Sequence, residues 1–285
     1  MSDEPFVLPG QLAASLVLVR HGESTYVAEG RFQGRHDPPL SPLGERQAAL
    51  VAARLASRNE GSPLPIPARA ARAIWHSPLR RAAETAAAIG EQQRGTPAVR
   101  PEVGLTELAQ GEWEGLLHSE VSTRWPTELA AWRRDPLHEH APGGEALLDA
   151  AGRVRRALRS LLDDLSAAQG QGQRSYTERS VTEPPSPPGV AVPGYPAAPA
   201  NEAATEPWVV LVAHDGIFRL ALMTLLGLDY ERFWSFPFSL CAITVVSLRD
   251  GVPALRAHNL SGHLAPLAAE QAAAEEARGD RRGAL

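Results

Sequence analysis

Residues Leu16–Glu23 read LVLVRHGE and form the stretch of this chain that decides its fold. Four aliphatic residues in a row, closed by a glycine, are typical of a strand in the buried centre of a parallel sheet. Ligands of such sheets bind beyond the carboxyl ends of the strands, which is where Arg20 and His21 fall. Gly22 lets the backbone turn close to a bound group. A guanidinium can bind the oxygens of a phosphoryl group, and an imidazole beside it can attack the phosphorus as a nucleophile.

Strands and helices alternate through the rest of the chain. Further strands are predicted at Ala73–His76, Trp208–Ala213, Cys241–Leu248 and Ala254–Ala257. Helices are predicted after the cap-and-proline pairs Ser41-Pro42 and Ser77-Pro78, over Glu145 to about Leu165, and over Gly216–Leu226. This alternation predicts a three-layer α/β/α fold with a mostly parallel central sheet.

The composition divides the chain into one domain with irregular additions. We expect a loose lead-in over residues 1–14, the domain over 15–264 and a frayed tail over 265–285. Within the domain, residues 105–143 show no convincing strand and are predicted to form short helices that cap the site. Residues 166–207 are rich in proline, glycine, serine and alanine and almost lack large aliphatic side chains, which predicts a disordered surface insertion.

The charge composition limits which partners and which reaction mechanisms are possible. The net charge is −5 and the pI is about 6.0, which argues against nucleic acid as a partner and for a local cationic pocket around any bound phosphate. All 28 basic residues are arginine. Mechanisms that need a lysine, such as a Schiff base or a phosphate-binding P-loop lysine, are therefore excluded.

The sequence also indicates where the protein works. No apolar run approaches 18 residues, and the first residues are acidic where a signal peptide needs basic ones. We therefore expect a soluble cytoplasmic protein with no membrane partner. The single cysteine, Cys241, lies in a strand-like run and is interpreted as a buried bystander rather than a nucleophile.

Four motifs occur in a fixed order along the chain. They are Arg20–Gly22, Ser77–Ala86 (SPLRRAAETA), Glu107–Gly115 (ELAQGEWEG) and Val212–Gly216 (VAHDG). Together they resemble the histidine phosphatase superfamily, branch 1, the phosphoglycerate mutase-like group. The resemblance covers roughly residues 15 to 264 apart from the insertion. It implies a phosphoglycerate mutase-like fold with a small helical cap and the hydrolysis of a phosphomonoester.

The motifs supply a residue for each step of phosphate ester hydrolysis. The resemblance implies that His21 attacks phosphorus and carries a phosphohistidine. Arg20 and Arg80 are expected to bind the phosphoryl oxygens, and His214, if protonated, adds a third cation. The helix that begins after His214, with Gly216 in its first turn, can offer backbone N–H groups to the same anion.

Glu107 is the predicted acid for the leaving group and the base for the hydrolytic water. Glu112 and Glu114 are close rivals, and Glu107 is preferred because it matches the family pattern of glutamate followed four residues later by glycine, here Gly111. Opposing effects of burial and nearby cations leave the direction of its pKa open. No metal or other cofactor is expected. The His138-Glu-His140 pair is not interpreted as a metal site.

Two positions depart from the family pattern. The asparagine usually found six residues after the nucleophile is Val27 here, so its phosphate contact is missing or comes from Ser24 or Gln33 in the loop that ends at Gly34. The residue after the second histidine, commonly glycine, is Asp215, which brings a carboxylate near the anion site or caps the helix. These residues, with Gly216, complete the expected substrate-binding set.

Three functions remain. The leading one is a metal-independent phosphomonoesterase acting on a small phosphorylated metabolite. The second is a phosphoglycerate mutase, for which the resemblance implies a tyrosine and a lysine where this chain has Gln110 and about His118. The arginine pair Arg133-Arg134 falls near the spacing that the resemblance implies for carboxylate binding, so a substrate with a carboxylate stays an alternative. The third is a non-catalytic member that binds a phosphorylated ligand or a protein. A homodimer stays an open alternative.

Overall fold

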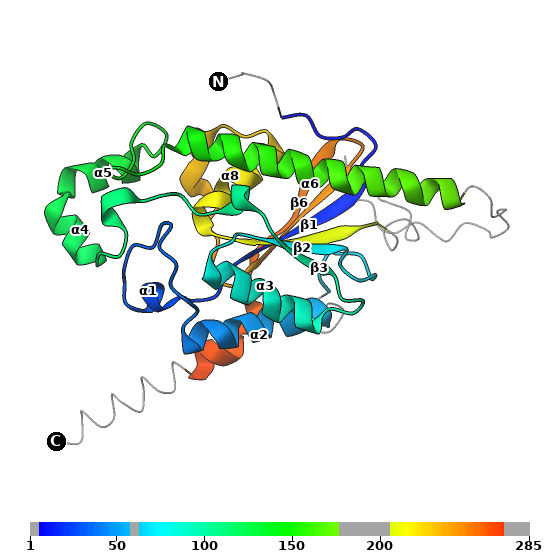
Figure 1. The fold of residues 1–285 in the computed structure, drawn as a ribbon, viewed down its shortest axis with the longest axis horizontal. Helices are drawn as coiled ribbons and strands as arrows, with labels where there is room; N and C mark the ends of the chain where they lie inside the picture. The colour runs from blue at the N-terminus through cyan, green and yellow to red at the C-terminus, as the bar shows by residue number, and fades with distance from the viewer. Residues whose placement is uncertain (1–5, 58–62, 177–205, 271–285) are drawn as a thin grey trace.

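A six-stranded sheet runs through the centre of the protein in the computed structural model, which describes all residues except 1–5, 58–62, 177–205 and 271–285 (Figure 1). The strand order is β3-β2-β4-β1-β5-β6. β1, β4, β2 and β3 are parallel to one another, and β5 and β6 form an antiparallel extension beside β1. The mostly parallel sheet predicted from the sequence is confirmed.

The strands span β1 Ala14–Arg20, β2 Ala73–His76, β3 Ala98–Pro101, β4 Trp208–Ala213, β5 Ile243–Arg249 and β6 Val252–Leu260. The helices span α1 Thr25–Ala28, α2 Pro42–Ala56, α3 Arg80–Gln92, α4 His118–Arg124, α5 Pro126–Arg134, α6 Leu147–Tyr176 and α8 Asp215–Leu226. Short 3-10 turns lie at η1 Val103–Leu105, η2 Gly111–Trp113, η3 Tyr230–Ser235 and η4 Gly262–Leu264.

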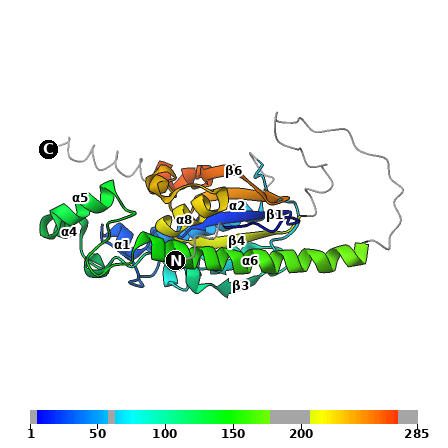
Figure 2. The ribbon, with the colours of Figure 1, turned by 90° about the horizontal axis from the view of Figure 1, so that it is seen from above.

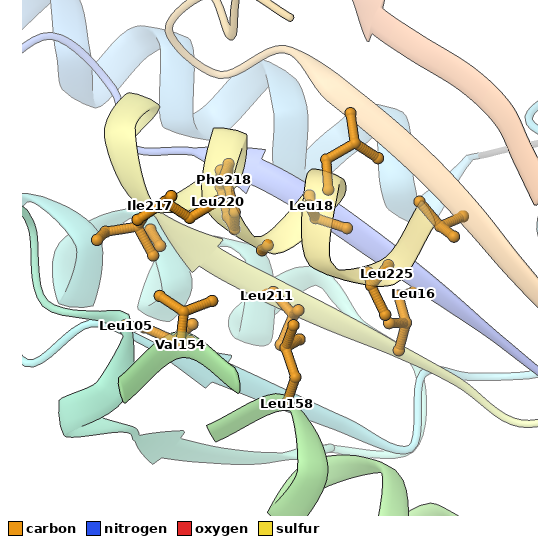
Figure 3. Close-up of a cluster of buried hydrophobic side chains, with 14 of the residues drawn as sticks. Leu16, Leu18, Leu105, Val154, Leu158, Leu211, Ile217, Phe218, Leu220 and Leu225 are labelled. Carbon is orange, nitrogen blue, oxygen red and sulfur yellow. The ribbon is translucent and has the colours of Figure 1, made fainter. Parts of the chain in front are cut away.

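Helices cover both faces of the sheet, which makes three layers (Figures 1 and 2). Alternate residues of β1 point to opposite faces, because successive side chains of a strand do so. Leu16 and Leu18 pack with α6 and α8, and Figure 3 shows part of this cluster. Val17 and Val19 pack with α2 and α3 on the other face. Burial on both faces explains the continuous apolar run of β1.

Residues 105–143 form a helical segment with a small core of its own. It contains η2, α4 and α5 and lies beyond the end of the sheet, at the left of Figure 1. Trp113 is fully buried there against Phe32 and Val121, and Trp125 and Trp132 pack around them. Trp113 is therefore a core residue of this segment, and Trp125 and Trp132 are partly buried beside it.

The structure corrects three predicted boundaries. α6 continues to Tyr176, so the first part of the predicted insertion is helical; residues 177–205 of that prediction lie outside the described part. The lead-in is not loose over its described part, since Leu12 is buried in the core and Ala13 hydrogen-bonds Gln169 through both backbone groups. Residues 265–270 are helical, and the rest of the predicted tail lies outside the described residues.

Candidate active site

Three neighbouring parallel strands end at one place in the molecule. β1 leads into His21, β4 into His214 and β2 into Ser77. Because carboxyl ends of parallel strands lie on the same edge of a sheet, these residues meet. The rings of His21 and His214 are 5.0 Å apart between centroids, and both residues are almost completely buried.

His21 has a defined tautomer. Its Nδ1 lies 2.6 Å from the carbonyl oxygen of Gly22, which can only accept a hydrogen bond, so Nδ1 carries the proton. Burial is the main cause that lowers the pKa of His21 well below its ordinary value, and the charges of Arg81 and Arg20 lower it further. The ring is therefore neutral at neutral pH, with an unprotonated Nε2. That is the form of imidazole that can attack phosphorus.

His214 is oriented by Ser77. The Ser77 hydroxyl lies 2.7 Å from His214 Nε2 and accepts a hydrogen bond from the backbone N–H of Leu79 at 3.3 Å. Among the hydrogen bonds of the described residues, Nε2 is the one acceptor available to the Ser77 O–H, so the hydroxyl donates to Nε2 and the proton of a neutral His214 sits on Nδ1. This Nδ1 is buried and has no hydrogen-bond partner among the described residues. It can donate to a bound anion.

The pKa of His214 lies well below its ordinary value, chiefly because the ring is buried and next because Arg81 is near. His214 therefore contributes a neutral N–H donor at this site, where the sequence analysis allowed for a third cation. Ser77 also differs from its predicted role as a helix cap. The N-cap of α3 is Leu79, and the Ser77 hydroxyl holds His214 instead.

Two guanidinium groups flank the histidines. Arg20 donates from Nη1 to the carbonyl oxygen of Phe238 at 2.7 Å. Arg81 donates from its two Nη atoms to the carbonyl oxygens of His36 and Gly34, at 2.8 and 2.9 Å. The Nε atoms of Arg20 and Arg81 are buried and have no partner among the described residues. Burial lowers the pKa of Arg81 to about 10, so it is still charged at neutral pH.

Arg80 does not join this cluster, and the prediction that placed it there is wrong. Its side chain is 56% exposed and pairs with Glu84 at 3.0 Å on the outer face of α3. Successive residues of a helix point about 100° apart, so only one of the two adjacent arginines can face the strand ends. The buried stripe of α3 runs through Arg81, Thr85 and Ile89, a four-residue spacing that the sequence already contains.

Among the carboxylates, Glu107 does most to raise the pKa of Arg81. Burial raises the pKa of Glu107, and the charge of Asp215 raises it further, while the Leu108 N–H and the two arginines oppose the rise. A Cβ added at Gly216 would lie 2.9 Å from Glu107 Oε1, so glycine there permits the close approach. The rival Glu112 is exposed, and Glu114 accepts backbone N–H groups of Arg35 and Gln110.

The loop residues of the expected binding set divide into two groups. Gln33 and Gly34 line the pocket beside the cluster, together with Val27. Ser24 is fully buried and outside the pocket lining: its hydroxyl accepts from the Val27 N–H at 3.1 Å and donates to Gln33 Oε1 at 2.5 Å. Ser24 therefore holds Gln33 in place and caps α1.

Asp215 lines the pocket at the first turn of α8. Its carboxylate accepts from Arg219 Nε at 2.9 Å and from the Phe238 backbone N–H at 3.0 Å. The Asp215 carboxylate therefore does not cap α8, although the sequence allowed that role. The N-cap residue of α8 is His214.

An open pocket of about 260 Å³ lies beside the cluster: Arg20 and Glu107 line it, whereas the two histidines and Arg81 are not among its lining residues. Its lining combines strand-end and loop residues with side chains of the helical segment: Arg20, Val27, Arg31, Phe32, Gln33, Gly34, Glu107, Leu108, Gln110, His118, Trp132, Asp215, Gly216, Phe233 and Trp234. Among the described residues, no group of three or more histidine, cysteine, aspartate or glutamate side chains is arranged to hold a metal ion. No helix in the same part of the chain is long and apolar enough to cross a membrane.

This arrangement has the elements of a phosphoryl-transfer site, and comparison with known proteins identifies its class. The family model of the histidine phosphatase superfamily (branch 1) matches residues 16–169 and 197–261. The chain belongs to this superfamily. The fold and the enzyme class predicted from the sequence, a phosphoric monoester hydrolase, are confirmed.

Individual relatives are phosphatases of small metabolites by name. The chain is 41% identical over 219 residues to glucosyl-3-phosphoglycerate phosphatase of Mycolicibacterium vanbaalenii, covering 76% of each chain. It is 27% identical over 249 residues to phosphoserine phosphatase 1 of Hydrogenobacter thermophilus, covering 87% of this chain and 93% of the relative. A solved mycobacterial glucosyl-3-phosphoglycerate phosphatase in complex with VO3 superimposes with a TM-score of 0.63 at 29% identity, over 87% of this chain and 99% of that one.

The two adjacent arginines of α3 give the first test of the site. Replacing Arg81 with alanine removes a buried donor to the phosphoryl oxygens and should lower kcat/KM for a phosphomonoester by about 10²–10³-fold. Arg80→Ala, its matched control, should change kcat/KM by less than about threefold, since an exposed pair contributes little. Phosphate release is measured for both, with thermal unfolding to confirm that each variant folds. A larger loss for Arg80→Ala than for Arg81→Ala would contradict the assignment.

Proposed function

We propose that the protein hydrolyses a small phosphorylated metabolite through a phosphohistidine formed on Nε2 of His21. The observation that carries this proposal is the 2.6 Å contact between His21 Nδ1 and the Gly22 carbonyl, which leaves Nε2 unprotonated in a buried site beside two guanidinium groups. The same contact aligns the ring, so that attack requires no tautomer change.

The reaction proceeds in two displacements. His21 Nε2 attacks phosphorus, the bond to the leaving oxygen breaks, and protonated Glu107 gives that oxygen its proton. Glu107, now a carboxylate, takes a proton from water while the water oxygen attacks phosphorus. The N–P bond breaks, which returns His21 to its neutral form and releases phosphate. Arg20, Arg81 and the Nδ1–H of His214 stabilise the charge on the non-bridging oxygens in both steps.

Hydrolysis is favoured over the mutase alternative by the pocket lining. Gln110 and His118 stand at the positions where the resemblance implies a tyrosine and a lysine in mutases, and both line the pocket. The relatives reported above are named as phosphatases, which supports the same choice. The third alternative, a non-catalytic member, is disfavoured because a complete set of nucleophile, cations and acid is assembled.

Two wider expectations stay part of the proposal. The helical segment 105–143 acts as a cap over the site, which is supported by the presence of Gln110, His118 and Trp132 in the pocket wall. A cytoplasmic location is supported by the single cysteine, Cys241, which is free and buried. Burial raises the pKa of this thiol, so it is not a nucleophile.

A histidine pair tests the assignment of the nucleophile. His21→Ala should lower kcat for a chromogenic phosphomonoester by at least about 10³-fold, because the group that forms the covalent intermediate is gone. His138→Ala is the matched control: this histidine is exposed, pairs with Asp135 and should leave kcat unchanged. Release of phosphate is followed at saturating ester. Activity of His21→Ala within tenfold of the unchanged protein would refute the proposal.

The pKa of Glu107 gives a second test through the pH profile. The first step needs protonated Glu107, and its pKa is raised, so kcat should fall as the pH rises through a value above the ordinary 4.5 of glutamate. Glu107→Gln should abolish that alkaline limb and lower kcat by about 10²–10⁴-fold for an alkyl phosphate. The loss should be smaller for a nitrophenyl phosphate, whose leaving oxygen needs little protonation. Equal losses of kcat/KM for the two esters, a quantity that does not include the shared hydrolysis step, would count against Glu107 as the acid.

A further inference from the structure

Four aromatic side chains, Phe32, Trp132, Phe233 and Trp234, line the pocket and are here called the aromatic wall; the two histidines are not among the lining residues. The four rings come from three separate parts of the chain: the loop after α1, helix α5 and the η3 turn. None of them takes part in the chemistry described above. Their contact with the pocket therefore bears on the leaving group of the ester and not on the phosphate.

The rings hold one another in a fixed arrangement. Trp132 and Trp234 meet edge to face, with centroids 5.1 Å apart and planes at 87°. Phe233 and Trp234 are 4.8 Å apart, and Trp132 also contacts the buried Trp113 at 5.8 Å. Edge-to-face pairs of this kind are favourable, and here they join the helical segment to the η3 turn. The wall is consequently anchored on both sides of the pocket.

Trp234 presents an open ring to the pocket. It is 40% exposed and is the one aromatic side chain among the described residues with more than a third of its surface exposed. The guanidinium of Arg219, which is 6% exposed, lies 5.1 Å from the Trp234 ring centroid. Arg219 is itself held by Asp215 at 2.9 Å and by the Phe233 carbonyl at 3.0 Å. Through this chain of contacts Trp234 is tied to the first turn of α8, next to His214.

Hydrogen-bonding groups line the same pocket as the aromatic wall. Gln33, Gln110, Arg31 and His118 all line the pocket there. In the described part of the chain, the side-chain amide of Gln110 and the amide nitrogen of Gln33 have no partner. Amide and guanidinium groups can bind neighbouring hydroxyl groups in pairs. An exposed aromatic face beside such groups matches a ligand with apolar C–H faces and a rim of hydroxyls.

The geometry points to a phosphomonoester whose leaving group carries a sugar ring, and we propose Trp234 as the residue that selects it. The inference deepens the proposed function and rests on it. A ring-free ester such as phosphoserine would leave the aromatic wall without a partner. A nucleobase is held best between parallel rings, whereas Trp132 and Trp234 are nearly perpendicular. The pocket of about 260 Å³ is close to the lower end of volumes typical of small-molecule sites, so it holds more than a phosphate group.

The test compares two esters on two tryptophan variants. Trp234→Leu keeps an apolar side chain but removes the ring, and it should lower kcat/KM for glucosyl-3-phosphoglycerate by about tenfold or more. For phosphoserine the same variant should change kcat/KM by less than about threefold, because no ring contact is lost. Trp125→Leu is the matched control: Trp125 lies in the same helical segment as Trp132 but not in the pocket, and neither ester should distinguish it from the unchanged protein.

Binding separates this inference from the proposed function. Calorimetric titration of glucosyl-3-phosphoglycerate into His21→Ala, with and without Trp234→Leu, measures ring recognition when no turnover occurs. Weaker binding by about tenfold in the double variant supports the inference even if neither ester is hydrolysed, in which case only the proposed function fails. Three results would overturn the inference. They are an equal loss of kcat/KM for both esters in Trp234→Leu, a loss of kcat/KM for phosphoserine alone, and an affinity for glucosyl-3-phosphoglycerate that Trp234→Leu leaves unchanged.

Discussion

A neutral, buried imidazole at the end of β1 is the constraint on which the rest of the site depends. His21 is removed from solvent, and the desolvation of its charged form does more to lower its pKa than either neighbouring arginine. The Gly22 carbonyl then determines which nitrogen carries the proton. Burial and one hydrogen bond together leave Nε2 unprotonated, as the proposed nucleophilic role of His21 requires, with no neighbouring base needed to deprotonate it.

The same burial makes the surroundings selective for an anion. Arg20 and Arg81 each keep an Nε–H without a partner among the described residues, and a buried donor in that state costs about 1–3 kcal/mol. A bound phosphoryl group would accept hydrogen bonds from these donors, and its negative charge would pair with both guanidinium groups. His214, held by Ser77, adds a neutral donor at the adjacent strand end. The parallel order of β2, β4 and β1 places Ser77, His214 and Arg20 on one edge of the sheet, and the first turn of α3 adds Arg81.

The parts of the fold and of the site that neighbouring residues encode can be predicted from the sequence, and the parts that depend on contacts between distant segments cannot. β1 and β4 were predicted from continuous apolar runs, and their terminal residues led to His21 and His214. β3 was missed because its four residues are exposed and show no apolar pattern. Arg80 was predicted on a helix that follows the Ser77-Pro78 pair, whereas α3 begins after Leu79 and its buried stripe includes Arg81. Bonds between distant segments, such as Ser77 to His214 and the Phe238 backbone N–H to Asp215, have no signature in the sequence.

The central claim is that the phosphoryl group passes through Nε2 of His21. The most direct measurement is rapid quenching of the enzyme with excess substrate under alkaline conditions, followed by mass spectrometry of the peptides. The account predicts an acid-labile phosphoryl group on His21 that appears no more slowly than phosphate is released and is absent from His21→Ala. Phosphate release at the full rate with the phosphoryl group on another residue, or with no phosphoenzyme formed, would contradict it.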